Sequence, residues 1–251
     1  MECSTPNKAP EWNDLTKDQQ ELFLEYGDLD HKYIDQTSRE IQEELNELYT
    51  SSQIHKYMDM ASKRQSNYYG ITDQYLYAAL DHLDLGDKYC LLLGSANPWY
   101  EAIFLSRGMY VDVQEYSERP NDLHPHLFYQ FPNDAIIRLH GYDLAVSISS
   151  FEHDGLGRYG DPLNPDGDFQ AMKDVAKVLK PSGCLILSIP VGKDKLVWNA
   201  HRIYGEKRLP KLLEGWTVIA SVGFNTDMLK VDTGIDATNQ PIFILQRNKN
   251  A

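Results

Sequence analysis

Apolar residues recur at helical spacing over the first third of the chain. Residues 14–64 contain no proline and a single glycine, and their leucine, isoleucine and aromatic residues return every three or four positions. This pattern predicts two amphipathic helices, at about 15–26 and 30–64, within a helical extension over residues 14–70. Ser51 is a candidate break in the second helix, and Ser38 is a candidate N-cap for a segment within it. The polar, proline-containing start predicts a flexible tail over residues 1–13.

The pattern changes after residue 71, where short apolar runs of strand length alternate with helical segments. The runs lie at 89–95, 109–116, 143–149, 184–192, 216–224 and 241–247. Strands that alternate with helices predict an α/β domain over residues 71–251, with a doubly wound, mostly parallel sheet covered by helices on both faces. The last two runs have no long helix between them, which favours an antiparallel pair at an edge of the sheet.

Charge and cysteine content exclude several classes of function. The net charge of −13, without any run of Lys or Arg, disfavours binding to nucleic acids or anionic membranes. The three cysteines are far apart, which disfavours a disulfide scaffold or a cysteine zinc site. No apolar stretch reaches the roughly 18–20 residues of a membrane span, and the first residues have no apolar signal core. We therefore expect a cytoplasmic protein without a membrane span.

Glycine and acidic residues follow the first two apolar runs, where an open α/β sheet binds its ligands. Gly94 and Ser95 end the first run, and Glu115 ends the second about twenty residues later. A carboxylate at that place can accept hydrogen bonds from two ribose hydroxyls. Asn133 and Asp134 follow and are available to an adenine amine. A GxGxxG motif is absent, and a tight turn beside a solvated glutamate fits the same residues.

The helix, turn and strand in AMKDVAKVLKPSGCLILSIP resemble a late segment of class I S-adenosylmethionine-dependent methyltransferases, where the turn usually reads LKPGG. The resemblance covers roughly residues 75–247 and implies a seven-stranded, Rossmann-like sheet with S-adenosylmethionine as cofactor. The usual ExGxGxG loop is replaced by LLLGSANPW, which has one glycine. The cofactor-binding residues that the resemblance implies are Gly94, Ser95, Ala96, Glu115, Tyr116, Asn133, Asp134 and Ser149.

Three longer strings resemble a domain-of-unknown-function family first described in nematodes. The strings are GSANPWYEA, SSFEHDGLGRYGDPLNPDGD and VGKDKLVWNAHRIYG. This resemblance implies the fold and no particular chemistry.

A dense cluster of polar residues follows the apolar run at 143–149. The sequence FEHDGLGRYGDPLNPDGD resembles the FEHFGxxRY stretch of cyclopropane fatty acid synthases, where a Glu, a His and a Tyr line the site beside the sulfonium. The similarity implies that Glu152, His153 and Tyr159 lie near the methyl acceptor. A hydroxyl acceptor benefits from a base, and His153 is the candidate for that role. Arg158 and Asp161 are candidate acceptor-binding residues.

The same cluster has a structural interpretation. A histidine after a strand is often structural, and the Asp-rich end of the cluster contains ordinary turn and helix-capping sequences. Because no DxDxDG loop is present, we expect no metal site.

A mixture of aromatic and polar residues follows the apolar run at 184–192, in KLVWNAHRIYG. Such a mixture suits a sugar or another polyol, and a loop packed under the N-terminal helices fits equally well. His201 is the alternative base. The candidate acceptor-binding residues of this segment are Trp198, Asn199, His201, Arg202 and Tyr204.

Together these features favour S-adenosylmethionine-dependent methylation at an oxygen of a small polar or glycan-like acceptor. One alternative is another nucleotide-cofactor enzyme on the same fold. Another is a non-catalytic, methyltransferase-like scaffold that uses its acidic N-terminal helices as an interaction surface.

Overall fold

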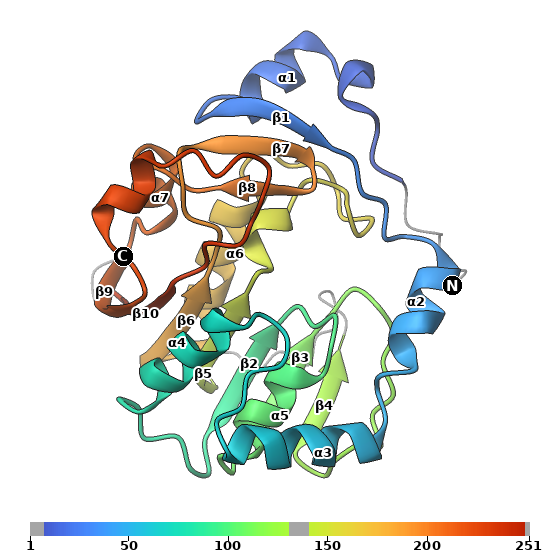
Figure 1. Ribbon diagram of the computed structural model, residues 1–251, viewed down its shortest axis with the longest axis vertical. Helices are drawn as coiled ribbons and strands as arrows, with labels where there is room; N and C mark the ends of the chain where they lie inside the picture. Colours follow the sequence, from blue (N-terminus) through green and yellow to red (C-terminus); the bar gives the residue numbers. More distant parts are fainter. Residues whose placement is uncertain (1–7, 131–140, 249–251) are drawn as a thin grey trace.

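The computed structural model describes residues 8–130 and 141–248, and it contains two β-sheets (Figure 1). The larger sheet has seven strands in the order β4-β3-β2-β5-β6-β10-β9, and the smaller has three in the order β1-β7-β8. The strands of the larger sheet are β2 (Tyr89–Leu93), β3 (Tyr110–Gln114), β4 (Leu127–Gln130), β5 (Tyr142–Ile148), β6 (Leu179–Ser188), β9 (Trp216–Val222) and β10 (Ile242–Arg247).

The larger sheet confirms the predicted fold class. Strands β4, β3, β2, β5 and β6 are parallel to their neighbours, whereas β10 is antiparallel to both β6 and β9. The predicted antiparallel pair therefore lies at one edge. The chain runs outward from β2 through β3 to β4 and then returns to the other side of β2 with β5. The strand order thus reverses between β2 and β5, and such a switch point is where open α/β sheets bind ligands.

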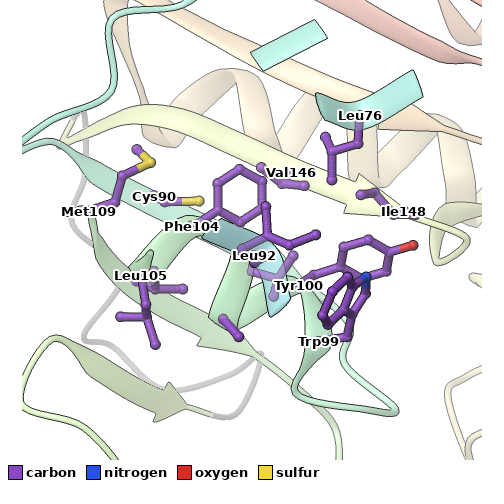
Figure 2. Close-up of a cluster of buried hydrophobic side chains, with 14 of the residues drawn as sticks. Leu76, Cys90, Leu92, Trp99, Tyr100, Phe104, Leu105, Met109, Val146 and Ile148 are labelled. Carbon is purple, nitrogen blue, oxygen red and sulfur yellow. The ribbon is translucent and has the colours of Figure 1, made fainter. Parts of the chain in front are cut away.

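Alternate residues of β2 belong to two different apolar clusters, one on each face of the sheet. Cys90 and Leu92 belong to the cluster formed with helices α3 (Ser51–Ser62), α4 (Ile71–Leu80) and α5 (Trp99–Leu105), and Figure 2 shows part of this cluster. Leu91 and Leu93 belong to the cluster formed with helices α6 (Gly167–Val178) and α7 (Arg208–Leu212). Because both faces of the strand are buried, its sequence is a continuous apolar run.

The N-terminal part differs from the two predicted helices. It forms a 3-10 helix (Trp12–Asp14), α1 (Lys17–Phe23), β1 (Asp28–Lys32) and α2 (Arg39–Asn46) before α3 begins. The prediction of a helix that begins near residue 30 is wrong, because β1 pairs in parallel with β7. The candidate N-cap Ser38 and the candidate break near Ser51 agree with the observed starts of α2 and α3. Ser38 accepts a hydrogen bond from the Ile41 amide at the start of α2, and Thr50 accepts one from the Gln53 amide at the start of α3.

The described end of the predicted tail is packed. Ala9 and Trp12 are buried, and the Trp12 ring lies 5.2 Å from that of Trp198 at an edge-to-face angle. The expectation of a flexible tail is therefore wrong for residues 8–13.

The segment predicted as a loop after the apolar run at 184–192 is a β-hairpin, made of β7 (Lys195–Asn199) and β8 (His201–Ile203). Figure 1 shows β1 beside β7, so the N-terminal segment covers this hairpin before it continues to α2 and α3. None of the helices in the described ranges has the length and apolar character of a membrane span.

Candidate active site

The loops that follow β2 and β5 touch at the switch point. Gly94 has a φ of +78°, which favours glycine, and a Cβ at this position would lie 2.6 Å from the Ser150 hydroxyl oxygen. A side chain would therefore push the two loops apart. The single glycine of the unusual loop is explained by this contact.

Glu115 ties the end of β3 to the loop after β2. Its Oε2 accepts a 2.6 Å hydrogen bond from the Ser95 amide, and its Oε1 accepts bonds of 2.8 and 3.3 Å from the amides of Tyr116 and Ser117. These bonds use three of the about four acceptor directions of a carboxylate. Burial raises the pKa of Glu115, and the amide donors oppose this rise. The predicted Gly94, Ser95 and Glu115 therefore lie together.

The other predicted cofactor residues have more varied positions. Ala96 is half-buried beside Ser95, and Tyr116 is exposed beside Glu115. Ser149 has a φ of +52° and follows β5 at the switch point. Asn133 and Asp134 lie outside the described residues.

Glu152 and His153 form a buried pair in a single 3-10 turn after β5 (Phe151–His153). Oε1 of Glu152 accepts a 2.7 Å hydrogen bond from the Ser149 hydroxyl and lies 3.7 Å from His153 Nε2. Its Oε2 is buried and has no hydrogen-bond partner among residues 8–130 and 141–248. Burial raises the pKa of Glu152 to about 7.

The protonation of His153 follows from its partner. Nδ1 lies 2.6 Å from the carbonyl oxygen of Ala200, which only accepts, and 3.4 Å from Nη1 of Arg158, which only donates. The shorter contact favours the tautomer that carries the proton on Nδ1 and leaves Nε2 as an acceptor. Burial lowers the pKa of His153 well below its usual value, and the nearby Arg158 lowers it further. His153 is therefore a neutral imidazole at pH 7.

Arg158 and Tyr159 lie beside this pair. The Arg158 guanidinium donates a 3.2 Å hydrogen bond to the same Ala200 carbonyl and a 2.7 Å bond to the Gln36 side chain. The Tyr159 ring lies 5.7 Å from the His153 ring, and the guanidinium lies 5.1 Å from the Tyr159 ring. The cluster predicted around the acceptor is thus brought together in space.

Asp161 has a structural role in the same loop. Its carboxylate accepts hydrogen bonds from the amides of Gly155, Gly157 and Tyr159 at 2.7, 3.1 and 3.3 Å. It shapes the loop that holds Arg158 and Tyr159. Within residues 8–130 and 141–248, no three His, Cys, Asp or Glu side chains are placed to hold a metal ion.

Four of the five residues predicted in the 195–205 segment hold the scaffold. Trp198 packs on Trp12 and Phe23, and the Asn199 side-chain oxygen accepts a 2.8 Å hydrogen bond from the Ile34 amide. Arg202 donates to the backbone carbonyls of Glu152, Asp154, Asn164 and Pro165. Tyr204 donates a 2.9 Å bond to Asp168, which also forms a buried ion pair with Arg208. For these four residues, the structure gives the packing alternative.

His201 differs from its neighbours because it faces the acceptor cluster. Its ring lies 6.4 Å from the His153 ring, and its buried Nε2 has no hydrogen-bond partner within the described part of the chain. Burial lowers the pKa of His201 to about 4, so it is also neutral at pH 7.

Sequence reasoning missed a second buried cluster, formed by Tyr49, Glu101 and Tyr129 behind Ser95. Glu101 accepts a hydrogen bond from the Ser95 hydroxyl and a 3.1 Å bond from Tyr129. Burial raises the pKa of Glu101 to about 7. The signal in the sequence was a lone acid within the otherwise apolar helix WYEAIFL, all of whose residues are buried.

Comparison with protein families gives a match over much of this region. A family model described as "Caenorhabditis protein of unknown function, DUF268" matches residues 87–241, which is more than half of the chain. The chain belongs to the DUF268 family. The matched range contains Gly94, Ser95, Glu115 and the Glu152–His153 pair, whereas β1, α2 and α3 precede it. No curated protein matches the chain.

Solved structures share the fold of this DUF268 protein. The PH0226 protein from Pyrococcus horikoshii OT3 is 14% identical, with a TM-score of 0.51 over 73% of this chain and 92% of that chain. An N1-methyltransferase of 1,6-didemethyltoxoflavin from Burkholderia thailandensis, solved with that compound and S-adenosylhomocysteine, is 15% identical. It has a TM-score of 0.49 over 83% of this chain and 88% of that chain. At such identities the likeness shows the fold alone.

Proposed function

We propose that this DUF268 protein is an S-adenosylmethionine-dependent methyltransferase that acts on an oxygen of a small polar or glycan-like acceptor. The observation that carries the proposal is the convergence of three strand ends at the switch point. Gly94 and Ser95 after β2, Glu115 after β3, and the Glu152–His153 pair after β5 meet where this class of sheet binds ligands.

The residues around Glu115 fit the cofactor. The carboxylate retains an acceptor direction toward the ribose hydroxyls, and the Gly94 turn lets the backbone approach the ligand closely. When bound, S-adenosylmethionine supplies an electrophilic methyl group on a sulfonium. Ala96, Tyr116 and Ser149 are the further candidates for contact, with Asn133 and Asp134 for the adenine.

His153 has the orientation required of a general base. The Ala200 carbonyl fixes the proton on Nδ1, so the unprotonated Nε2 can take a proton from an acceptor hydroxyl. Glu152 lies 3.7 Å from Nε2, and in its ionised form it would stabilise the positive charge that His153 then carries. Its pKa of about 7 makes the ionised form the major one above pH 7. Arg158, Tyr159 and His201 would hold oxygens of the acceptor beside Nε2.

Positioning supplies the remainder of the rate. Methyl transfer is an in-line displacement, so holding the acceptor oxygen against the methyl group lowers the barrier even without strong base assistance. The buried setting of Glu152 and His153 also keeps bulk water away from the proton that moves.

Calorimetric titration with S-adenosylmethionine tests the proposal, with Glu115→Ala and the exposed Glu118→Ala as a matched pair. We expect wild-type and Glu118→Ala proteins to bind equally. Glu115→Ala should lose about 1.5–3 kcal/mol of binding free energy, because one charge-assisted hydrogen bond to the ribose is removed. Absence of binding to the wild-type protein, or equal binding by Glu115→Ala, would contradict the cofactor assignment.

Transfer is tested by incubating the protein with methyl-labelled S-adenosylmethionine and fractionated small molecules and glycans. Label in an alkali-stable ether product supports methylation at oxygen. Binding of the cofactor without label in any fraction would instead support the non-catalytic scaffold.

A further inference from the structure

The loop that would hold the cofactor is anchored from outside the family-matched range. We propose that Tyr49, in the segment between α2 and α3, is a positioning residue that holds Ser95 in the conformation that binds S-adenosylmethionine. The inference rests on the proposed function, because it concerns the same cofactor loop.

The contact between Tyr49 and Ser95 is direct and buried. The Tyr49 hydroxyl donates a 2.6 Å hydrogen bond to the Ser95 carbonyl oxygen and lies 2.9 Å from the Ser95 hydroxyl. Only 3% of Tyr49 and 8% of Ser95 is exposed, so water does not compete for these bonds.

Every polar atom of Ser95 thus takes part in a hydrogen bond. Its amide donates to Glu115, its carbonyl accepts from Tyr49, and its hydroxyl donates to Glu101. Of these partners, Glu115 and Glu101 lie within the family-matched range, and Tyr49 is the contribution of the preceding segment. A loop fixed in this way loses less conformational entropy when a ligand binds.

The tyrosine ring is held independently of its hydroxyl. It packs edge-to-face on Tyr129 at 5.7 Å, and the Arg119 guanidinium lies 4.5 Å from its centre. Arg119 in turn donates a 2.7 Å hydrogen bond to Asn46 at the end of α2. Tyr49→Phe should therefore keep the packing and remove only the contacts to Ser95.

Tyr77 offers a matched control in α4. It is fully buried, and its hydroxyl donates a 2.8 Å hydrogen bond to the backbone carbonyl of Gln65. Tyr77→Phe thus removes the same type of bond, and its acceptor, Gln65, lies outside the cofactor loop.

The experiment measures the affinity for S-adenosylmethionine and S-adenosylhomocysteine, together with thermal stability, in wild-type, Tyr49→Phe and Tyr77→Phe proteins. We expect Tyr49→Phe to weaken both affinities by about 3- to 10-fold, the effect of one or two lost hydrogen bonds. Tyr77→Phe should bind both compounds like the wild type, even though its melting temperature falls by about as much as that of Tyr49→Phe. Amide hydrogen exchange of residues 94–97 should accelerate in Tyr49→Phe alone.

Two results would overturn the inference separately from the proposed function. If the wild type binds and Tyr49→Phe binds equally well, with unchanged exchange in the loop, Tyr49 has only a structural role. If both tyrosine variants lose affinity to the same extent, the loss reflects general stability. Failure of the wild type to bind either compound would refute the proposed function, and the inference would fall with it.

Discussion

At the scale of single residues, the candidate site depends on which atom of each side chain is already engaged. His153 has its Nδ1 on a carbonyl and its Nε2 3.7 Å from Glu152, and Glu115 has both oxygens on backbone amides. Gly94 is required because a Cβ would meet Ser150. The hydrogen bonds already formed therefore determine which atoms of each residue are available to a ligand, and residue type alone would not show this.

The role of His153 leads to a prediction about turnover. His153→Ala should reduce methyl transfer by roughly 100-fold or more while S-adenosylmethionine still binds, because the proton acceptor is removed and the cofactor loops are not. Because burial lowers the pKa of His153, its neutral form persists as pH falls to about 6.5, and transfer should not decline through this group above that pH.

The exposed histidine His82 serves as the control, and His82→Ala should transfer at the wild-type rate. A small loss at His153 together with a large loss in His201→Ala would assign the base to His201. If neither substitution slows transfer, the reaction depends on proximity alone.

The sequence was informative about residues that follow a strand closely. Gly94, Glu115 and the Glu152–His153 pair could be found because the ends of parallel strands meet at one edge. Gln36 and Tyr49 could not be found, because they contact residues 122 and 46 positions away, respectively. Nothing in their local sequence distinguishes them from packing residues.

At the scale of elements, long apolar runs were predictable and short polar strands were not. The strand β1 has the sequence DLDHK, with one apolar residue, and its strand conformation comes from parallel pairing with β7. Tertiary contacts override local preference in such a segment. The segment of β7 and β8 was predicted as a loop that either binds the acceptor or packs under the N-terminal helices. Its residues are buried along both strands, so its mixed aromatic and polar sequence lacks the alternation that indicates a half-exposed strand.

The packing of this hairpin predicts the effect of removing Trp198. The side chain is 1% exposed and contacts Trp12 and Phe23, so Trp198→Ala should lower the free energy of unfolding by about 3–5 kcal/mol. Leu22→Ala in α1 is the control, since Leu22 is 57% exposed, and should change stability by less than about 0.5 kcal/mol.

Denaturant unfolding measures both variants, and titration with S-adenosylmethionine measures the binding of the folded protein. We expect the cofactor affinity of Trp198→Ala to remain that of the wild type. Unchanged stability with a loss of acceptor methylation would instead support the alternative in which Trp198 binds the acceptor.

At the scale of the whole molecule, buried titratable groups from both sides of the switch point contribute opposite dependences of stability on pH. Burial raises the pKa of Glu101 and Glu152 to about 7, and it lowers the pKa of His201 to about 4 and that of His153 in the same direction. Between about pH 4.5 and 6.5, the folded protein holds protons on the two glutamates that the unfolded chain has released. Over the same range, the unfolded chain holds protons on the two histidines that the folded protein lacks.

The two glutamates and the two histidines therefore have opposite effects on the pH dependence of stability over this range. A substitution of one glutamate should reveal the contribution of that glutamate. The contribution of Glu101 to stability is full below about pH 4.5, the value in an unfolded chain, and is lost as pH rises toward 7. Glu101→Gln does not titrate, so its free energy of unfolding should rise relative to that of the wild type across this interval. The slope should approach about 1.4 kcal/mol per pH unit, with a total of about 3 kcal/mol.

Denaturant unfolding at several pH values measures this difference, and the exposed Glu118→Gln should show none. A difference for Glu101→Gln that is independent of pH would mean that this carboxyl is already ionised in the folded protein. The lone acid of α5 would then hold Ser95 as a carboxylate and not as a neutral acid.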